Sequence, residues 1–200
     1  MGLFSFFKFS KAAKPATLTF DANEYVPAFW EDDYCQIEIV PFENKVFVLG
    51  QAIAIEDLTQ KSKTDYGFTA TFERDKMPVQ TLSKKIRIKY LEQTLLGFQF
   101  RKAKHIRYNN SDILNCETDR TKAFGFSNFT IFFDTEEEFV KNIWIHIGLI
   151  VSVTQFNLIE TALYTLGEEC GLILIDWNSL ELFDMSDKTQ IKKYLMDYWK

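Results

Sequence analysis

The alternation of apolar and polar positions is clearest in the stretch from Ile143 to Asp184. Ile143, Ile145, Ile147, Leu149 and Val151 recur at every second position, a period typical of a strand with one buried face. A helix is the alternative, because apolar residues from Phe139 to Ile150 also fall three or four apart. We expect a short helix over Thr135–Lys141 that gives way to the strand, since Gly148 and the Ile and Val content disfavour a longer helix. The acidic residues 136–138 then occupy the first turn of that helix, where the helix dipole favours them.

The next segment carries helix boundary signals. Ser152 and Gln155 form a capping-box pattern, and an apolar stripe at helical spacing follows it. Gly171 lies where a helix C-terminal glycine is expected. The last elements predicted are a strand at Leu172–Ile175, its hairpin partner at Leu180–Phe183 and a helix that begins near Ser186 or Asp187.

Upstream, the periodicity is weaker but still predicts alternating elements. The strands expected there are Tyr34–Val40, ended by Pro41, then Gly67–Glu73, Lys104–Tyr108, Ala123–Phe126 and Phe129–Phe133. The helices expected are Glu43–Lys61 and Thr81–Leu96, although alternation at Ile86, Ile88 and Tyr90 leaves a strand open for the second.

This element order predicts an α+β fold, with a mixed or antiparallel sheet and helices on one face. Residues 35–73 and 143–176 both run strand, helix, strand, so two topologically related lobes are one possible organisation. We then expect an N-terminal arm (1–15), an N-terminal lobe (16–110) and a C-terminal lobe (111–200), divided at the loop Asn109–Asp112. A single domain is the alternative.

Composition narrows the class of protein. The chain has 200 residues, 46% of them hydrophobic and 20 of them Phe, which is enough for a core built on aromatic packing. No apolar run approaches the length of a transmembrane helix. Cys35, Cys116 and Cys170 are odd in number and widely spaced, which favours neither a disulfide framework nor a metal site. We therefore expect a cytoplasmic protein.

Charge is unevenly distributed along the chain. The net charge is −5, yet the segment from Lys84 to Arg107 has eight Lys and Arg against Glu92 alone, so it carries +7 and leaves −12 elsewhere. A solvated basic face is the preferred interpretation, and a phosphate-binding stripe is the alternative. The acidity of the whole chain opposes general nucleic-acid binding.

Motifs for catalysis are missing from the sequence. The chain has no P-loop, no G-x-G-x-x-G and no H-E-x-x-H pattern, and its two His and three Cys give no recognised metal spacing. We predict no catalytic residue, no metal ligand and no cofactor. The alternative is a metal-dependent, nuclease-like carboxylate enzyme, in which Glu43 and Lys45 form a Glu-x-Lys pair and Asp32 or Asp33 shares the cation.

Two stretches place aromatic residues beside acids, a combination suited to binding a basic protein. Trp and Tyr serve as interface anchors, while carboxylates attract a cationic partner. The candidate partner-binding residues are Trp30, Glu31, Asp32, Asp33 and Tyr34 in the first stretch and Asp176, Trp177 and Asn178 in the second.

A resemblance to known proteins rests on three patches. They are DDYCQIEIVP at Asp32–Pro41, IFFD with VKNIWIHI at Ile131–Asp134 and Val140–Ile147, and LILIDWNSLELFD at Leu172–Asp184. These patches resemble uncharacterised bacterial proteins that are similar to the immunity partners of polymorphic or type VI secreted toxins. The resemblance covers about half of the chain. It implies a non-catalytic antidote that binds and occludes a cognate toxin, and it transfers no site residues.

The sequence therefore predicts a cytoplasmic, non-catalytic binding protein whose partner is a cognate toxin. The carboxylate enzyme described above is the first alternative. A second alternative is an adaptor held at a membrane by residues 1–14, which include four Phe and three Lys. The sequence leaves the toxin class and the oligomeric state open.

Overall fold

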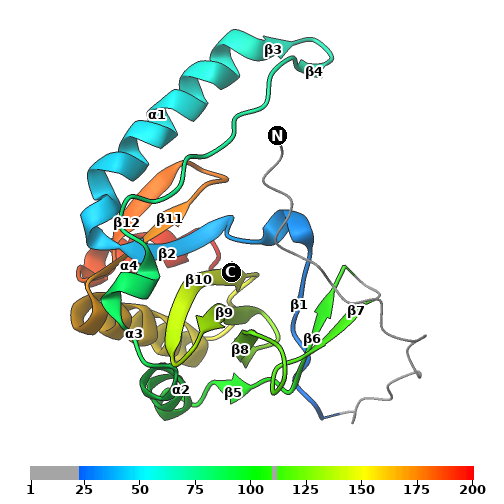
Figure 1. The fold of residues 1–200 in the computed structure, drawn as a ribbon, viewed down its shortest axis with the longest axis vertical. Helices are drawn as coiled ribbons and strands as arrows, with labels where there is room; N and C mark the ends of the chain where they lie inside the picture. Colours follow the sequence, from blue (N-terminus) through cyan, green and yellow to red (C-terminus); the bar gives the residue numbers. More distant parts are fainter. Residues whose placement is uncertain (1–22, 110–111) are drawn as a thin grey trace.

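The central feature of the fold is a seven-stranded antiparallel sheet (Figure 1). The structure is a computed structural model that describes residues 23–109 and 112–200, so predictions for residues 1–22 fall outside it. In spatial order the strands are β12 (Glu181–Asp184), β11 (Leu172–Asp176), β2 (Ile37–Pro41), β10 (Phe139–Ile147), β9 (Phe129–Glu136), β8 (Thr121–Phe126) and β5 (Arg101–Lys102).

Three helices cover one face of this sheet, and the α+β prediction is confirmed. They are α2 (Ile88–Gly97), α3 (Val153–Cys170) and α4 (Lys188–Met196). Their apolar side chains join those of alternate strand positions, such as Ile39, Ile143 and Leu174, in the largest buried cluster. None of the helices among residues 23–109 and 112–200 is both long and apolar enough to cross a membrane.

The opposite face has two separate covers. A small sheet of β1 (Ala28–Phe29), β6 (His105–Tyr108) and β7 (Asp112–Asn115) packs over Phe132 and Trp144. Helix α1 (Lys45–Ser62) packs over Val40, Ile173 and Ile175 through Val48. The sheet is therefore covered on both faces, whereas the sequence predicted helices on one face only.

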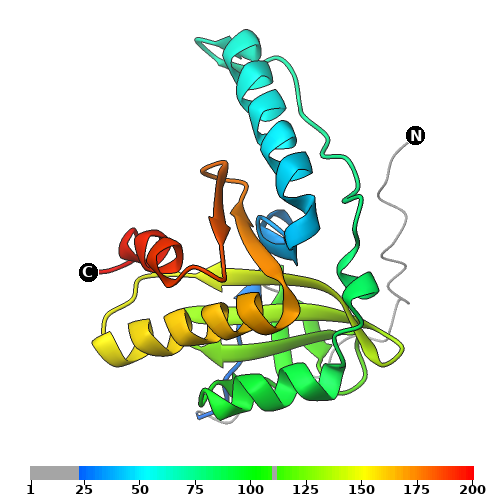
Figure 2. The same ribbon diagram turned by 90° about the vertical axis from the view of Figure 1, so that its left-hand side faces the viewer.

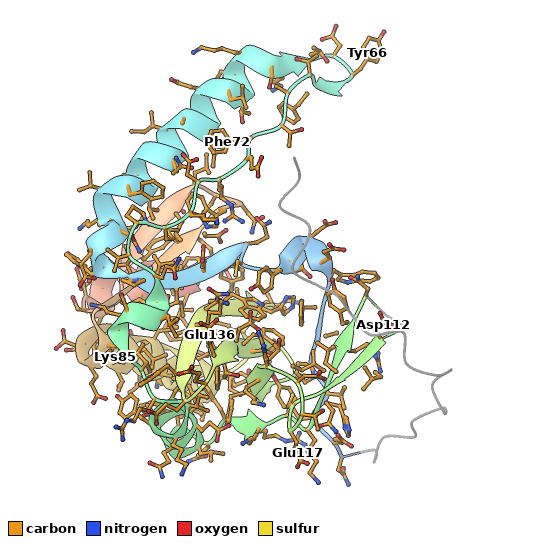
Figure 3. The ribbon with its side chains drawn as sticks, viewed as in Figure 1. Tyr66, Phe72, Lys85, Asp112, Glu117 and Glu136 are labelled. Carbon is orange, nitrogen blue, oxygen red and sulfur yellow. The ribbon has the colours of Figure 1, made fainter. Side chains whose placement is uncertain are left out.

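Helix α1 forms a protrusion with the segment that follows it, residues 45–80 together (Figures 1 and 2). At its tip is the short hairpin of β3 (Lys63–Thr64) and β4 (Gly67–Phe68), from which the labelled Tyr66 extends (Figure 3). Residues 69–80, the return segment, then run back along α1. Paired side-chain and backbone hydrogen bonds attach them: Gln51 with Asp75 at 3.0 and 3.1 Å, and Asn44 with Val79 at 2.7 and 3.0 Å.

Strand β2 joins the two halves of the chain. It lies between β10 and β11, with Ile39 opposite Ile143 on one side and Leu174 on the other. A strand from residues 16–110 is thus inserted between two strands from residues 111–200, so no boundary near residue 110 separates two sheets. The two strand–helix–strand units also differ, because β11 joins the main sheet after α3, whereas the hairpin after α1 stays outside it.

Local signals placed the C-terminal elements correctly. Ser152 caps α3 by accepting a 3.2 Å hydrogen bond from the Gln155 backbone N–H, and Gly171 ends the helix in the left-handed conformation. Asp187 caps α4 in the same way, through the backbone N–H of Thr189 at 2.8 Å. The predicted helix over Glu43–Lys61 is likewise confirmed as α1.

The helix predicted over Thr135–Lys141 is wrong. These residues form the turn and flanking strands of the β9–β10 hairpin, with Glu136 paired to Phe139 and Glu137 at a φ of 54°. The acidic run is a hairpin turn instead of a first helical turn. Pairing along the whole length of β9 and β10 outweighs the weak helical spacing, because each pair adds ladder hydrogen bonds and buried area.

Two other segments differ from expectation between β4 and α2. Of the strand expected over Gly67–Glu73, only Gly67–Phe68 is paired. Thr69 bonds to the backbone carbonyl of Ser62 at the end of α1, and the chain then continues as the unpaired return segment. The helix expected over Thr81–Leu96 is interrupted. A 3₁₀ turn, η3 (Thr81–Lys84), ends at Lys85 in the left-handed conformation, and α2 begins at Ile88.

Gly167 provides a test of how closely α3 packs on the chain before α4. A Cβ at this position would lie 2.3 Å from the backbone carbon of Met185, so Gly167→Ala forces backbone apart. We expect this variant to lower the free energy of unfolding by about 1–3 kcal/mol, measured by urea denaturation. Gly97→Ala is the control, since nothing lies within 4 Å of its Cβ position, and an equal loss there would contradict the packing argument.

Candidate functional site

The two predicted aromatic and acidic stretches lie at the same end of the main sheet. Residues Trp30–Tyr34 enter β2 through a 3₁₀ turn, η1 (Glu31–Asp33), and residues 177–178 leave β11 beside it. Asp176 is paired with Ile37, and the Trp177 backbone N–H donates a 2.9 Å hydrogen bond to the carbonyl of Gln36. Antiparallel pairing of β2 with β11 therefore brings together residues that are about 140 positions apart.

The first stretch remains on the surface. Trp30 has 48% of its surface exposed, and Glu31 and Asp32 are exposed beside it. The Asp33 carboxylate accepts a 3.1 Å hydrogen bond from the Trp30 backbone N–H, which holds the turn. The backbone N–H of Glu31 donates to Asn109 Oδ1 at 2.9 Å and ties the turn to the end of β6.

The second stretch is mostly buried, so the expectation that Asp176 and Trp177 face the solvent is wrong. Asp176 Oδ2 accepts hydrogen bonds from the hydroxyls of Tyr194 and Tyr198, at 3.3 and 3.2 Å. Burial raises the pKa of Tyr194, and the Asp176 charge adds to the rise. Of the three predicted residues, Asn178 alone is exposed.

Two residues that the sequence interpretation missed complete the surface around η1. Burial raises the pKa of Tyr108, and the neighbouring charges of Glu31, Asp112 and Asp32 raise it further. Asp112 is paired with Tyr108 across β6 and β7, and the Glu31 backbone is bonded to the adjacent Asn109, so we call Trp30, Glu31, Asp32, Tyr108 and Asp112 the acidic edge. Tyr108 and Asp112 are brought there by the β6–β7 hairpin and by the parallel pairing of β1 with β6. No local sequence signal identifies that pairing.

Tyr34, the remaining predicted residue, attaches η1 to the main sheet. Its hydroxyl donates a 2.7 Å hydrogen bond to Asp134 Oδ2 and accepts one from Asn142 Nδ2 at 3.0 Å. Asp134 Oδ1 accepts a further bond from Thr121 at 2.7 Å. The tyrosine ring packs edge-on against Trp144, with 4.8 Å between the ring centroids. Tyr34 therefore connects η1 to β9 and β10 of the sheet, and Asp134 extends this network to Thr121 in β8.

Arg74 of the return segment covers a second polar cluster next to this edge. Its guanidinium lies 4.7 Å from the ring centroid of Trp177 and donates a 3.1 Å hydrogen bond to the carbonyl of Cys35. Beneath it, Glu38 accepts a 3.3 Å hydrogen bond from Trp177 Nε1. Burial raises the pKa of Glu38 to about 7, against the opposing effects of the Arg74 charge and the Trp177 hydrogen bond. Cys35 has a φ of 54°, a strained value for this residue type.

The residues of the alternative carboxylate enzyme are not brought together. Asp32 and Asp33 precede β2, whereas Glu43 and Lys45 follow its other end, in η2 (Phe42–Asn44) and at the start of α1. Glu43 instead forms a 2.9 Å ion pair with Lys84. Within residues 23–109 and 112–200, no three His, Cys, Asp or Glu side chains are grouped to hold a metal ion.

Part of the basic segment is neutralised within the fold. Lys84 pairs with Glu43, and Lys102 pairs with Glu92 at 2.7 Å. Arg101 and Lys104 border a shallow recess of about 250 Å³ together with Glu24.

Comparisons with known proteins give no assignment for this arrangement. No protein-family model matches the chain, and neither a curated protein nor a solved structure matches it.

The partly buried Glu38 predicts a specific pH dependence of stability. The folded-state pKa is raised from 4.5 to about 7, so the contribution of the protonated carboxyl is fully present below pH 4.5 and is lost as the pH rises through 7. Between these values, we expect wild-type protein to lose on the order of 1–3 kcal/mol of unfolding free energy relative to Glu38→Gln. Denaturation at a series of pH values measures this; parallel curves for the two proteins would contradict it.

Arg74 is predicted to hold the return segment on the sheet. We expect Arg74→Ala to lower the unfolding free energy by about 1–2 kcal/mol, because it removes a cation–π contact and a hydrogen bond over a partly buried carboxyl. Hydrogen exchange of residues 69–76 is expected to accelerate in this variant. Lys76→Ala, an exposed position on the same segment, provides the control. Equal exchange in both variants would show that Arg74 is not an anchor.

Proposed function

We propose that this protein is a non-catalytic binding protein that acts in the cytoplasm and neutralises a cognate toxin by occluding it. The resemblance of three sequence patches to bacterial immunity proteins supports the toxin as partner. The acidic edge supports the binding mode, and it is the observation that carries the proposal.

The acidic edge combines the two features of a charge-guided interface. Trp30 is exposed and offers a large apolar ring as an anchor. Glu31 and Asp32 follow Trp30 in η1, and Asp112 is paired with Tyr108. Their negative charge attracts a basic surface over a distance of about 10 Å at ordinary ionic strength. The hydrogen bond from the Glu31 backbone N–H to Asn109 Oδ1, and the bond from Trp30 to Asp33 at η1, hold these side chains on a fixed backbone, which limits the entropy lost on binding.

Three carboxylates at this end of the sheet have structural partners. Asp134 accepts hydrogen bonds from two hydroxyls, Asp176 binds two tyrosine hydroxyls, and Glu38 lies beneath Arg74 and Trp177. Carboxylates used in this way brace the surface instead of presenting a reactive group. This supports occlusion in preference to catalysis.

The proposal is tested by isolating the partner from the native host. Tagged protein is recovered from resting and toxin-producing cells, and stoichiometric partners are identified by mass spectrometry. We expect one basic partner, whose toxicity in a heterologous host is suppressed when the protein is coexpressed. A partner that remains toxic on coexpression, or no stoichiometric partner in either condition, would overturn the proposal.

Charge reversal at the acidic edge gives a residue-level prediction for the isolated complex. We expect Glu31→Lys to slow association with the partner about 3- to 10-fold at low salt, with a smaller effect at high salt, because steering is lost. Surface plasmon resonance measures both rates.

A matched control lies on the same small sheet. Glu117→Lys changes an exposed acid beyond the opposite end of β7 from Asp112, as the labelled residues in Figure 3 show. We expect this variant to retain near wild-type association. Equal slowing by the control and by the edge variant would indicate a nonspecific effect of net charge and would contradict the acidic edge as the binding surface.

A further inference from the structure

The outer face of α1 is apolar and open to solvent. Its inner face is occupied, since Val48 and Ala52 are buried and Gln51 bonds to the return segment. On the outer face, Val46, Leu49 and Ile53 have 82%, 43% and 63% of their surface exposed. The spacing of three and four residues places them on one side of the helix, and we call them the outer stripe.

This arrangement is unusual for a helix at a protein surface. The segment Val46–Ile55 contains no charged residue, so α1 is apolar on both sides through its first half. A surface helix ordinarily has a polar outer face, and one that is apolar all round is ordinarily covered. Gly50 lies beside the stripe with nothing within 4 Å of its Cβ position, which lets another backbone approach closely. In Figure 2 the helix rises from the sheet beside the return segment.

We propose that the outer stripe packs against the outer stripe of a second copy of this chain, with the two α1 helices antiparallel. The distribution of charge around the stripe favours this occupant. Lys45 lies at the N-terminal end of the stripe, and Glu56 and Asp57 lie just beyond Ile53 at the other end.

An antiparallel alignment that stacks Leu49 on Ile53 of the other copy places Lys45 beside Glu56 and Asp57 of that copy, twice by symmetry. A parallel alignment would instead bring like charges together. In the antiparallel pair the two helix dipoles point in opposite directions, which is favourable. Lys45 lies in the first turn of α1, where the helix dipole disfavours a cation, and the acids of the other copy offset that cost.

The size of the surface sets the expected strength. A stable interface buries about 800 Å² on each partner, and three side chains along about 10 Å of helix cover less than that, even with the half-exposed Phe42 at the end of the stripe. The dimer is therefore in equilibrium with the monomer and depends on protein concentration. The inference uses α1 alone and does not rest on the proposed toxin partner.

Sedimentation velocity of the full chain over a concentration series tests the dimer. We expect the weight-average mass to rise from that of one chain toward that of two, and Ile53→Glu to weaken association at least about 10-fold, because it places a charge in the apolar contact. Leu96→Glu is the matched control: Leu96 is 50% exposed at the end of α2, far from α1 (Figure 1), and this variant is expected to associate like the wild type. Circular dichroism establishes that each variant is folded.

Charge exchange tests the antiparallel register. Lys45→Glu alone and Glu56→Lys alone are each expected to weaken association about 3- to 10-fold, and the double variant is expected to recover most of it, because the pair is restored between copies. A wild-type chain that stays monomeric at every concentration would overturn the proposal. So would association that Ile53→Glu leaves unchanged, or a double variant no better than the single ones.

Discussion

The structure depends on the position of β2 between β10 and β11. Ladder bonds on both sides make it a central strand, so neither of its edges is left unpaired. Ile37 and Ile39 point to the helices α2, α3 and α4, while Val40 points the other way and requires a second cover. Helix α1 and the return segment supply that cover. The chain leaves the sheet after Pro41, forms α1 over this face and comes back along α1 as the return segment.

The same constraint buries polar groups that then have to be satisfied. Glu38 alternates with the apolar positions of β2 and lies beneath the cover, where Trp177 and Arg74 offset part of the cost of its burial. Asp176, directly across from Ile37, is satisfied by two tyrosines near the end of the chain. These contacts tie the return segment and α4 to the sheet, and they give η1 a rigid base.

Two exposed surfaces of different chemistry result. The acidic edge, at η1 and the β6–β7 hairpin, combines exposed acids with the exposed ring of Trp30. The outer stripe of α1 is apolar and uncharged. They belong to different elements, so a dimer formed through α1 leaves both acidic edges to bind partners. Salt screens charge but hardly affects apolar contact, so binding at the acidic edge is expected to weaken more with added salt than contact through the outer stripe.

The sequence by itself determined the α+β class, the helices α1, α3 and α4, and the hairpin of β11 and β12. The signals for these elements are local, because they consist of apolar periodicity and of helix caps at Ser152, Asp187 and Gly171. It also identified Trp30, Glu31 and Asp32 as exposed residues of the candidate surface. Only the tertiary structure decided that Thr135–Lys141 is a hairpin, that Asp176 and Trp177 are buried, and that Tyr108 and Asp112 join the acidic edge. These outcomes depend on which distant strands pair and which face each pairing covers, and strand pairing leaves no signal within a single segment.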